Sequence, residues 1–203
     1  KKTKKFTKDC QNFYYHKTHE RIKRFLRNNR SLENPNIFYR GLKIKGLKEI
    51  LNKIDWKYLC NGLPQFIHGD LQFDNILMNR KKEFKLIDWR QSFGKSVRVG
   101  DQYYDFAKLL GGLEINYDLI KKNRFDYELN KENVKLKIPK RKNTQNLIIC
   151  LEKFLNKRKF DLKKVRILTG LIFLNMSPLH HHPFDKLLFL YGKYYLQKNL
   201  GLN

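Results

Sequence analysis

A group of polar residues between positions 66 and 88 limits the folds open to this chain more than any other segment. It reads His68-Gly69-Asp70, then Asn75 five residues after the aspartate, then Asp88 thirteen residues further on. The apolar run 76–78 can pair with the run 84–87 across the polar turn 79–82. Such a hairpin would bring Asn75 and Asp88 side by side, because one begins the first strand and the other follows the return strand.

Oxygen-bearing side chains placed in this way suit phosphoryl transfer. That reaction needs a carboxylate that accepts or orients the proton of the attacking hydroxyl, and Mg²⁺ held by oxygen ligands from at least two protein positions. Asp70 lies in the predicted loop, whereas Asn75 and Asp88 lie at the two ends of the hairpin. An ordinary buried His-Gly-Asp turn is the alternative, but the number and spacing of the polar residues favour a site.

This segment resembles the catalytic loop and the metal-binding aspartate of the protein-kinase-like superfamily. The resemblance implies that Asp70 is the catalytic base and that His68 braces the loop. It also implies that Asn75 and Asp88 bind Mg²⁺ and, through it, ATP. Arg90 would then lie near a phosphate or an anionic substrate, although a solvated surface arginine is an equal alternative.

Two departures from protein kinases indicate a branch of that superfamily. Gly69 stands where protein kinases carry an arginine that engages a phosphorylated activation loop. Only twelve residues lead from Asp88 to Gly100, which is too short for a platform that binds a protein substrate. Both features, and the pair Asp88-Trp89, are similar to the aminoglycoside phosphotransferases and choline kinases, which phosphorylate hydroxyl groups of small molecules.

The segment from Gly100 to Ala107 is similar to a second signature of that branch. The resemblance implies that Asp105 lies on a buried helix and accepts hydrogen bonds from the backbone of the catalytic loop. Asp101 is a possible substrate or phosphate contact, and its position also suits a carboxylate that interacts with the start of a helix.

The predicted fold is α+β and mostly helical, and it corresponds to the C-terminal lobe of a protein-kinase-like fold. A helical lead-in over 1–60 precedes the catalytic loop, hairpin and helix over 61–112, and a helical subdomain over 113–203 carries an inserted hairpin near 125–138. Residues 31–45 are predicted to be a loop. The predicted helices cover 9–29, 46–59, 101–114, 144–157, 162–175 and 184–199.

Nothing before Asp70 supplies the strand lysine, the partner glutamate and the phosphate-covering loop that such enzymes need. An N-terminal lobe is therefore expected outside the chain shown. The three cysteines are widely spaced and suggest neither a disulfide framework nor a zinc site, so the cytoplasm is the expected location. No apolar run is long enough to span a membrane.

The formal net charge of +25 raises the possibility of nucleic-acid binding, but the basic residues are spread along the whole chain. The charge disfavours a polycationic acceptor and favours a sugar, a sugar phosphate or a polyol, with an amino alcohol as second choice. His180 lies in a run of three histidines, and adjacent histidines point in different directions and rarely converge on a metal. The resemblance implies instead that this segment lines the substrate cleft, so His180 is a candidate substrate contact.

The function predicted from the sequence is ATP-dependent transfer of a phosphoryl group to a hydroxyl of a small molecule, with cell-envelope synthesis as one expected context. Two alternatives remain open. One is a catalytically inactive lobe that binds partners, and the other is a basic nucleic-acid-binding module. The sequence does not indicate the oligomeric state.

Overall fold

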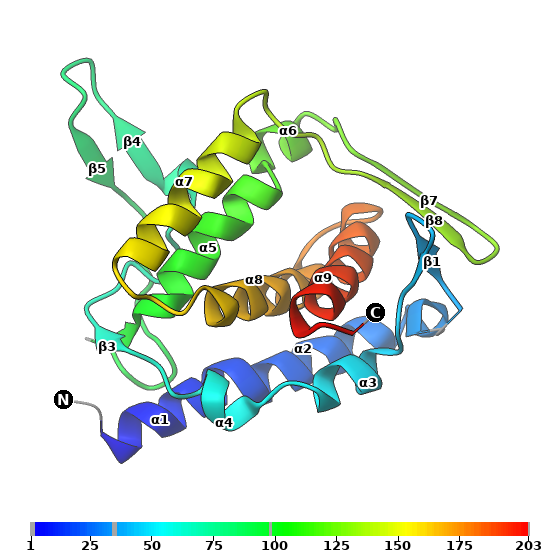
Figure 1. The fold of residues 1–203 in the computed structure, drawn as a ribbon, viewed down its shortest axis with the longest axis horizontal. Helices are drawn as coiled ribbons and strands as arrows, with labels where there is room; N and C mark the ends of the chain where they lie inside the picture. Colours follow the sequence, from blue (N-terminus) through cyan, green and yellow to red (C-terminus); the bar gives the residue numbers. More distant parts are fainter. Residues whose placement is uncertain (1–2, 34–35, 98, 203) are drawn as a thin grey trace.

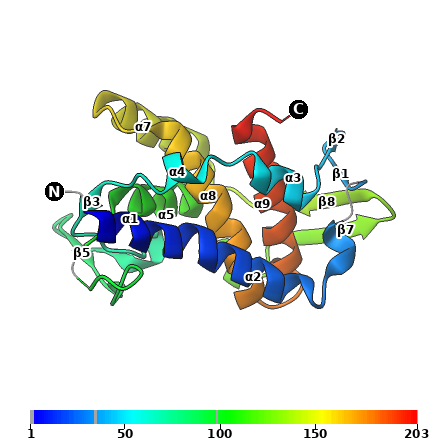
Figure 2. The same ribbon diagram turned by 90° about the horizontal axis from the view of Figure 1, so that it is seen from below.

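A computed structural model describes residues 3–33, 36–97 and 99–202, and it shows an α+β fold that is mostly helical (Figure 1). The chain begins with a long helical rod, built from α1 (Lys4–Gln11), a π-helical stretch (Asn12–His16) and α2 (Lys17–Leu26), which Figure 2 shows along its length. The predicted helix 9–29 therefore begins too late and ends too late. Thr3 starts the rod, because its hydroxyl accepts a hydrogen bond from the backbone N–H of Phe6 at 3.2 Å.

The core lies between three helices whose positions were predicted. They are α5 (Gln102–Glu114), α8 (Leu162–Met176) and α9 (Phe184–Leu200), and α8 packs closely against both others. α8 is buried around most of its circumference, as its apolar sequence indicated. The predicted helix 144–157 is confirmed as α7 (Thr144–Lys157), which packs against α5.

The predicted helix 46–59 is wrong, because two short helices replace it. α3 (Leu47–Asn52) and α4 (Trp56–Leu59) are separated by Asp55. The Asp55 carboxylate accepts a hydrogen bond from the backbone N–H of Tyr58 at 2.9 Å, so this residue caps a new helix. Aspartate in the middle of an apolar helical pattern was the signal for the break.

The inserted hairpin is confirmed as β7 (Asp126–Asn130) and β8 (Asn133–Lys137). The loop predicted for 31–45 is wrong, because this segment holds a 3₁₀ turn (Arg30–Glu33) and the strands β1 (Phe38–Tyr39) and β2 (Leu42–Lys43). Arg40 and Gly41 both have positive φ, 53° and 75°, which suits the tight turn between the two strands. β1 pairs in parallel with β8, which gives a four-stranded sheet in the order β2-β1-β8-β7.

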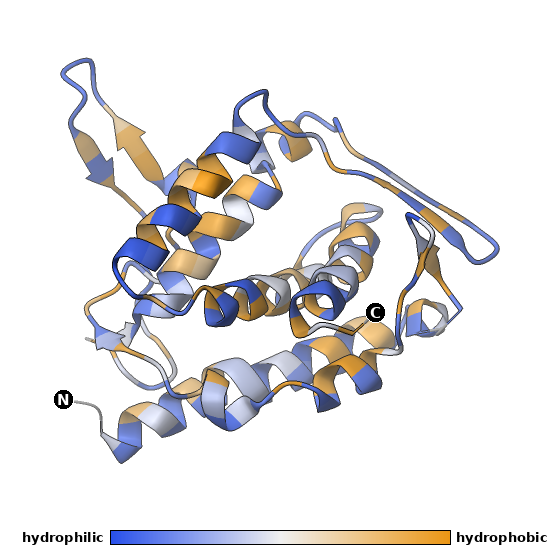
Figure 3. Ribbon diagram, in the orientation of Figure 1, coloured by the Kyte–Doolittle hydropathy of each residue, from blue (hydrophilic) through white to orange (hydrophobic). Residues whose placement is uncertain are grey.

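The predicted hairpin after the loop that carries Asp70 is also confirmed. β4 (Ile76–Met78) pairs with β5 (Phe84–Leu86) in antiparallel register, and it follows a 3₁₀ turn at Phe73–Asn75. This hairpin projects from the body of the molecule, and Figure 3 shows apolar residues along it. Leu77, Met78 and Phe84 are all exposed there.

Shorter elements complete the described chain. β3 (Pro64–Gln65) pairs with β6 (Gly100–Asp101) just before α5 and so connects the two ends of segment 66–99. α6 (Tyr117–Lys121) follows α5, and a 3₁₀ turn (Ser177–Leu179) joins α8 to α9. None of the helices in the described ranges combines the length and the apolar character that a bilayer crossing requires.

Candidate active site

Asp105 on α5 holds the loop that carries Asp70 through two hydrogen bonds. The two carboxylate oxygens of Asp105 accept hydrogen bonds from the backbone N–H groups of His68 and Gly69, each at 2.7 Å. This is the arrangement expected from the sequence. Burial raises the pKa of Asp105 above its ordinary value, and the two backbone N–H groups oppose that shift.

Gly69 is required at its position for two reasons. Its φ of +77° is a left-handed conformation that other residues rarely adopt. A Cβ atom there would also lie 2.6 Å from the Cβ of Arg90. The close approach lets Arg90 donate two hydrogen bonds to the loop: its Nε to the Gly69 carbonyl at 2.8 Å and its backbone N–H to the His68 carbonyl at 2.9 Å.

His68 braces the loop against the return strand. Its Nδ1 accepts from the backbone N–H of Asp70 at 3.2 Å, and its Nε2 lies 2.8 Å from the carbonyl of Ile87. These contacts fit a neutral ring that is protonated on Nε2. The backbone N–H of Ile87 in turn donates to the carbonyl of Asn75 at 3.0 Å, so the loop and the hairpin form one hydrogen-bonded unit.

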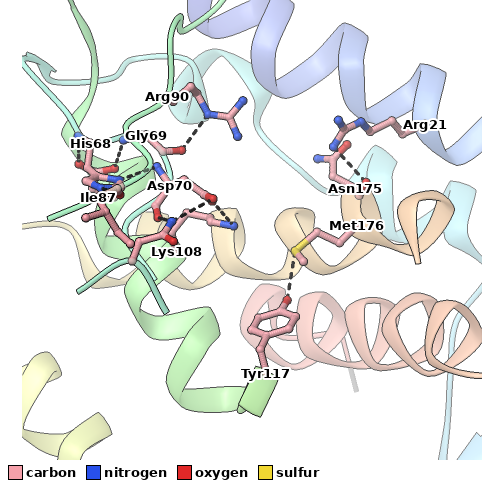
Figure 4. A network of polar contacts seen from close by, with 12 residues as sticks. Arg21, His68, Gly69, Asp70, Ile87, Arg90, Lys108, Tyr117, Asn175 and Met176 are labelled. Carbon is pink, nitrogen blue, oxygen red and sulfur yellow. Dashed lines mark hydrogen bonds and ion pairs between the residues drawn. The ribbon is translucent and has the colours of Figure 1, made fainter. Parts of the chain in front are cut away.

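The Asp70 carboxylate makes two polar contacts (Figure 4). Its Oδ1 lies 2.7 Å from the ammonium nitrogen of Lys108, and its Oδ2 accepts from the amide Nδ2 of Asn75 at 3.3 Å. The same amide also donates to the Asp70 carbonyl at 2.9 Å. Lys108 was not predicted from the sequence. Its position three residues after Asp105 was the available signal, because residues three apart share a helix face.

Asn75 and Asp88 have the chemistry that a Mg²⁺ ion requires. Because the Asn75 amide group donates to Asp70, its Oδ1 points elsewhere, and neither that atom nor the Asp88 carboxylate forms a hydrogen bond or an ion pair within the described ranges. Asp88 is exposed and has a φ of +56°. Such conformations are uncommon outside glycine and concentrate at functional sites.

The described residues do not surround a Mg²⁺ ion with acidic, histidine or cysteine ligands. The part of the chain that the structure describes holds no group of three or more histidine, cysteine, aspartate or glutamate side chains able to bind a metal. Mg²⁺ commonly binds one or two protein oxygens together with water and the phosphates of a nucleotide. Asn75 and Asp88 fit that mode.

Asp70 lines an open cavity of about 230 Å³ between the N-terminal rod, the loop that carries Asp70, α5 and α8. Figure 4 shows Asp70 and Lys108 on one side of this region, with Arg21 and Asn175 on the other. The lining residues that carry charge are Lys17, Arg21, Asp70, Arg90 and Lys108.

The remaining candidates from the sequence fall in different places. Arg90 lines the cavity, as a substrate contact would. Asp101 is fully buried and does not line it: its carboxylate accepts from the backbone N–H groups of Leu63 and Tyr103 and from the hydroxyl of Tyr14. It therefore acts as the cap of α5, which was the alternative interpretation.

His180 also stays outside the cavity lining. Its ring packs against Phe184 and Tyr117, with ring centroids 5.0 and 6.3 Å apart, and burial lowers its pKa. These contacts give it a packing role between α6 and α9.

Lys17 is the most unusual charged group of the cavity. Burial lowers its pKa to about 7, and the positive charges of Arg21 on the same rod, Arg90 after the hairpin and Lys108 on α5 act in the same direction. Asp70 opposes the shift, but more weakly. No local sequence pattern indicates the lowered pKa of Lys17, because this residue is one of several basic residues on the same helix.

We expect the free energy of unfolding to rise with pH between about 7 and 10 because of Lys17. In that range the unfolded chain still binds the lysine proton and the folded protein does not, so deprotonation favours the folded state. A Lys17→Met protein should lack this contribution, and the difference between the two proteins should change by roughly 1 kcal/mol per pH unit. Lys193, with a pKa lowered to about 8 by burial, is present in both proteins and cancels in the difference.

The measurement is urea unfolding of both proteins at pH 6.5, 8 and 9.5. Parallel pH profiles would show that Lys17 has an ordinary pKa in the folded protein.

Comparison of the chain with protein-family models, with curated proteins and with solved structures found no match in any of the three.

Proposed function

We propose that this protein is an ATP- and Mg²⁺-dependent phosphotransferase that phosphorylates a hydroxyl group of a small molecule. The observation that carries the proposal is the position of the Asp70 carboxylate. It lies at the wall of an open cavity, on a loop fixed by Asp105, and on the same hydrogen-bonded unit as the segments that carry Asn75 and Asp88.

In the proposed reaction Asp70 accepts the proton of the acceptor hydroxyl as that oxygen bonds to the γ-phosphorus of ATP. The bond from the γ-phosphorus to the bridging oxygen breaks, and ADP leaves with that oxygen. Asn75 and Asp88 would hold Mg²⁺, which when bound neutralises the phosphate charge. His68 and Asp105 keep the loop in place, because a positioned base requires a fixed geometry.

Lys108 has a role that follows from its contact with Asp70. Its side chain is 8% exposed, and its ammonium group fixes one oxygen of the Asp70 carboxylate. The other oxygen receives only the longer contact from Asn75. We propose that this second oxygen receives the acceptor hydroxyl.

The described residues before Asp70 form helices and three short strands, β1, β2 and β3. This proposal does not assign the remaining contacts to ATP to residues of this segment. We also propose the cytoplasm as the location, because three widely spaced cysteines make no disulfide framework.

The test is incubation of the full-length protein with γ-labelled ATP and Mg²⁺, together with a panel of sugars, sugar phosphates, polyols and amino alcohols. The expected result is label on one class of acceptor, lost when EDTA removes the metal. Label that appears on no acceptor, in a protein that is folded by circular dichroism, would contradict the proposal. Binding of DNA or RNA with a steep salt dependence would then favour the nucleic-acid alternative.

A further inference from the structure

The cavity beside Asp70 carries an excess of positive charge. Among the described residues, its lining includes four cationic side chains and one carboxylate. The carboxylate of Asp70 is already paired with Lys108 at 2.7 Å. Within the described ranges, Lys17, Arg21 and Arg90 form no ion pair with an acidic side chain. Below pH 7, where Lys17 is protonated, three cations therefore face the cavity without a counter-charge.

The two arginines are anchored in place with donors left over. Arg21 donates from one terminal nitrogen to the carbonyl of Asn175 at 3.1 Å, and Arg90 donates from Nε to the carbonyl of Gly69 at 2.8 Å. A guanidinium group has five N–H donors in a planar fork that matches phosphate. Anchored in this way, each side chain loses less freedom when it binds an anion.

Lys17 sits in a place that disfavours its charge. It is partly buried and two arginines share its cavity, although the face of the Phe13 ring, whose centroid lies 3.7 Å from the ammonium nitrogen, favours the cation. The lowered pKa of Lys17 reflects the same crowding. Keeping a cation there reduces stability, and such unfavourable charges concentrate at binding sites.

Two further features of the cavity indicate the chemical groups that its ligand carries. The amide oxygen of Asn175 is buried and has no hydrogen-bond partner among the described residues, although the Nδ2 atom donates to the Thr18 hydroxyl at 2.8 Å. A ligand hydroxyl could donate to that oxygen, since a buried acceptor without a partner is costly. The floor is apolar and is formed by Leu168, Leu171, Ile172 and Met176, which suits a carbon skeleton.

We propose that this cavity binds a hydroxyl-bearing acceptor that carries a phosphate monoester, with the phosphate held by Lys17, Arg21 and Arg90 and a hydroxyl presented to Asp70. The proposal rests on the proposed function and names its substrate class. Cationic acceptors such as amino alcohols are disfavoured by the same charges. The competing assignment of these cations is to the phosphates of ATP, and the experiment separates the two.

The first arm measures binding by calorimetry without ATP. The probes are glycerol and glycerol 1-phosphate, ribose and ribose 5-phosphate, and glucosamine. We expect each phosphate to bind at least ten times more tightly than its neutral parent, and glucosamine to bind no better than a neutral sugar. Equal binding within each pair would overturn the proposal.

The second arm uses variants of Lys17. Lys17→Met should weaken binding of the phosphates at least tenfold and leave the neutral parents within twofold, whereas Lys17→Arg should retain most of the affinity. The matched control is Lys135→Met, which removes the same charge from an exposed position on β8 that pairs only loosely with Glu128 at 3.6 Å. Equal losses in Lys17→Met and Lys135→Met would show a general effect of net charge and would contradict the site.

The third arm compares KM values in the transfer assay. Lys17→Met should raise KM for the phosphorylated acceptor and not for ATP, and the reverse pattern would assign the cations to ATP. The arms also separate this proposal from the proposed function. Selective binding of phosphorylated probes without phosphoryl transfer would support the phosphate site and contradict the proposed reaction. Transfer to a neutral acceptor with no preference for phosphorylated ones would support the reaction and contradict the phosphate site.

Discussion

An Asp70→Asn protein should transfer phosphoryl groups at least about a hundredfold more slowly than the parent, which is the scale of a positioned general base. The amide has the shape of the carboxylate but cannot accept the proton of the acceptor hydroxyl. KM for ATP should change little, because Asp70 lies at the acceptor cavity. The measurement is kcat and KM for both substrates at a fixed Mg²⁺ concentration.

The Asp70→Asn substitution also removes the ion pair with Lys108. Two further variants separate the resulting loss of stability from the loss of the proton acceptor. Lys108 is buried, so removal of its partner should lower the free energy of unfolding by about 1–3 kcal/mol. A double variant, Asp70→Asn with Lys108→Met, should regain part of that stability and remain inactive. Asp126→Asn is the matched control, because Asp126 is exposed on β7. Activity of Asp70→Asn within threefold of the parent would contradict the role of Asp70.

The second large effect is expected for Asp105→Asn. Both oxygens of Asp105 accept from backbone N–H groups, and an asparagine can present only one oxygen there. Its NH₂ group would face the N–H of His68 or Gly69, which leaves a buried donor without an acceptor. We expect the free energy of unfolding to fall by about 2–3 kcal/mol and the transfer rate to fall at least tenfold.

Hydrogen exchange distinguishes this local effect from a general loss of stability. The amides of His68 and Gly69 should exchange much faster in Asp105→Asn, while amides of α8 should change only in proportion to global stability. Asp126→Asn should leave both groups as in the parent. Unchanged protection of His68 and Gly69 would show that Asp105 does not hold the loop.

The helices and strands that could be predicted are those whose signal lies within a short stretch of sequence. The hairpins at 76–86 and 126–137 follow from alternation and from the turn residues between their strands, and α7, α8 and α9 follow from long apolar patterns. The small strands β1 and β2 were missed because two-residue strands carry little pattern. Their parallel pairing with β8 is a long-range contact that local sequence does not encode.

The site residues also fall into those that a local sequence pattern indicates and those that only tertiary packing brings together. Asp70, Asn75 and Asp88 share a short segment with a recognisable spacing, and the structure joins the loop and hairpin that carry them in one hydrogen-bonded unit. Lys17 and Lys108 lie on helices that approach the loop only through the packing of the whole domain. Their selection from 44 lysines and arginines depends on tertiary contacts, which the sequence alone does not supply.

The most direct test of the central claim follows heavy oxygen from ATP to the acceptor. The substrate is ATP labelled with ¹⁸O at all four oxygens bonded to the γ-phosphorus, including the oxygen that bridges to the β-phosphorus. It is incubated with the full-length protein, Mg²⁺ and a phosphorylated polyol, and the masses of the products are measured by mass spectrometry. The account predicts a new phosphate ester with three heavy oxygens and ADP with one, formed in equal amounts and absent with Asp70→Asn. Heavy inorganic phosphate without a labelled ester, or an equal yield from Asp70→Asn, would contradict it.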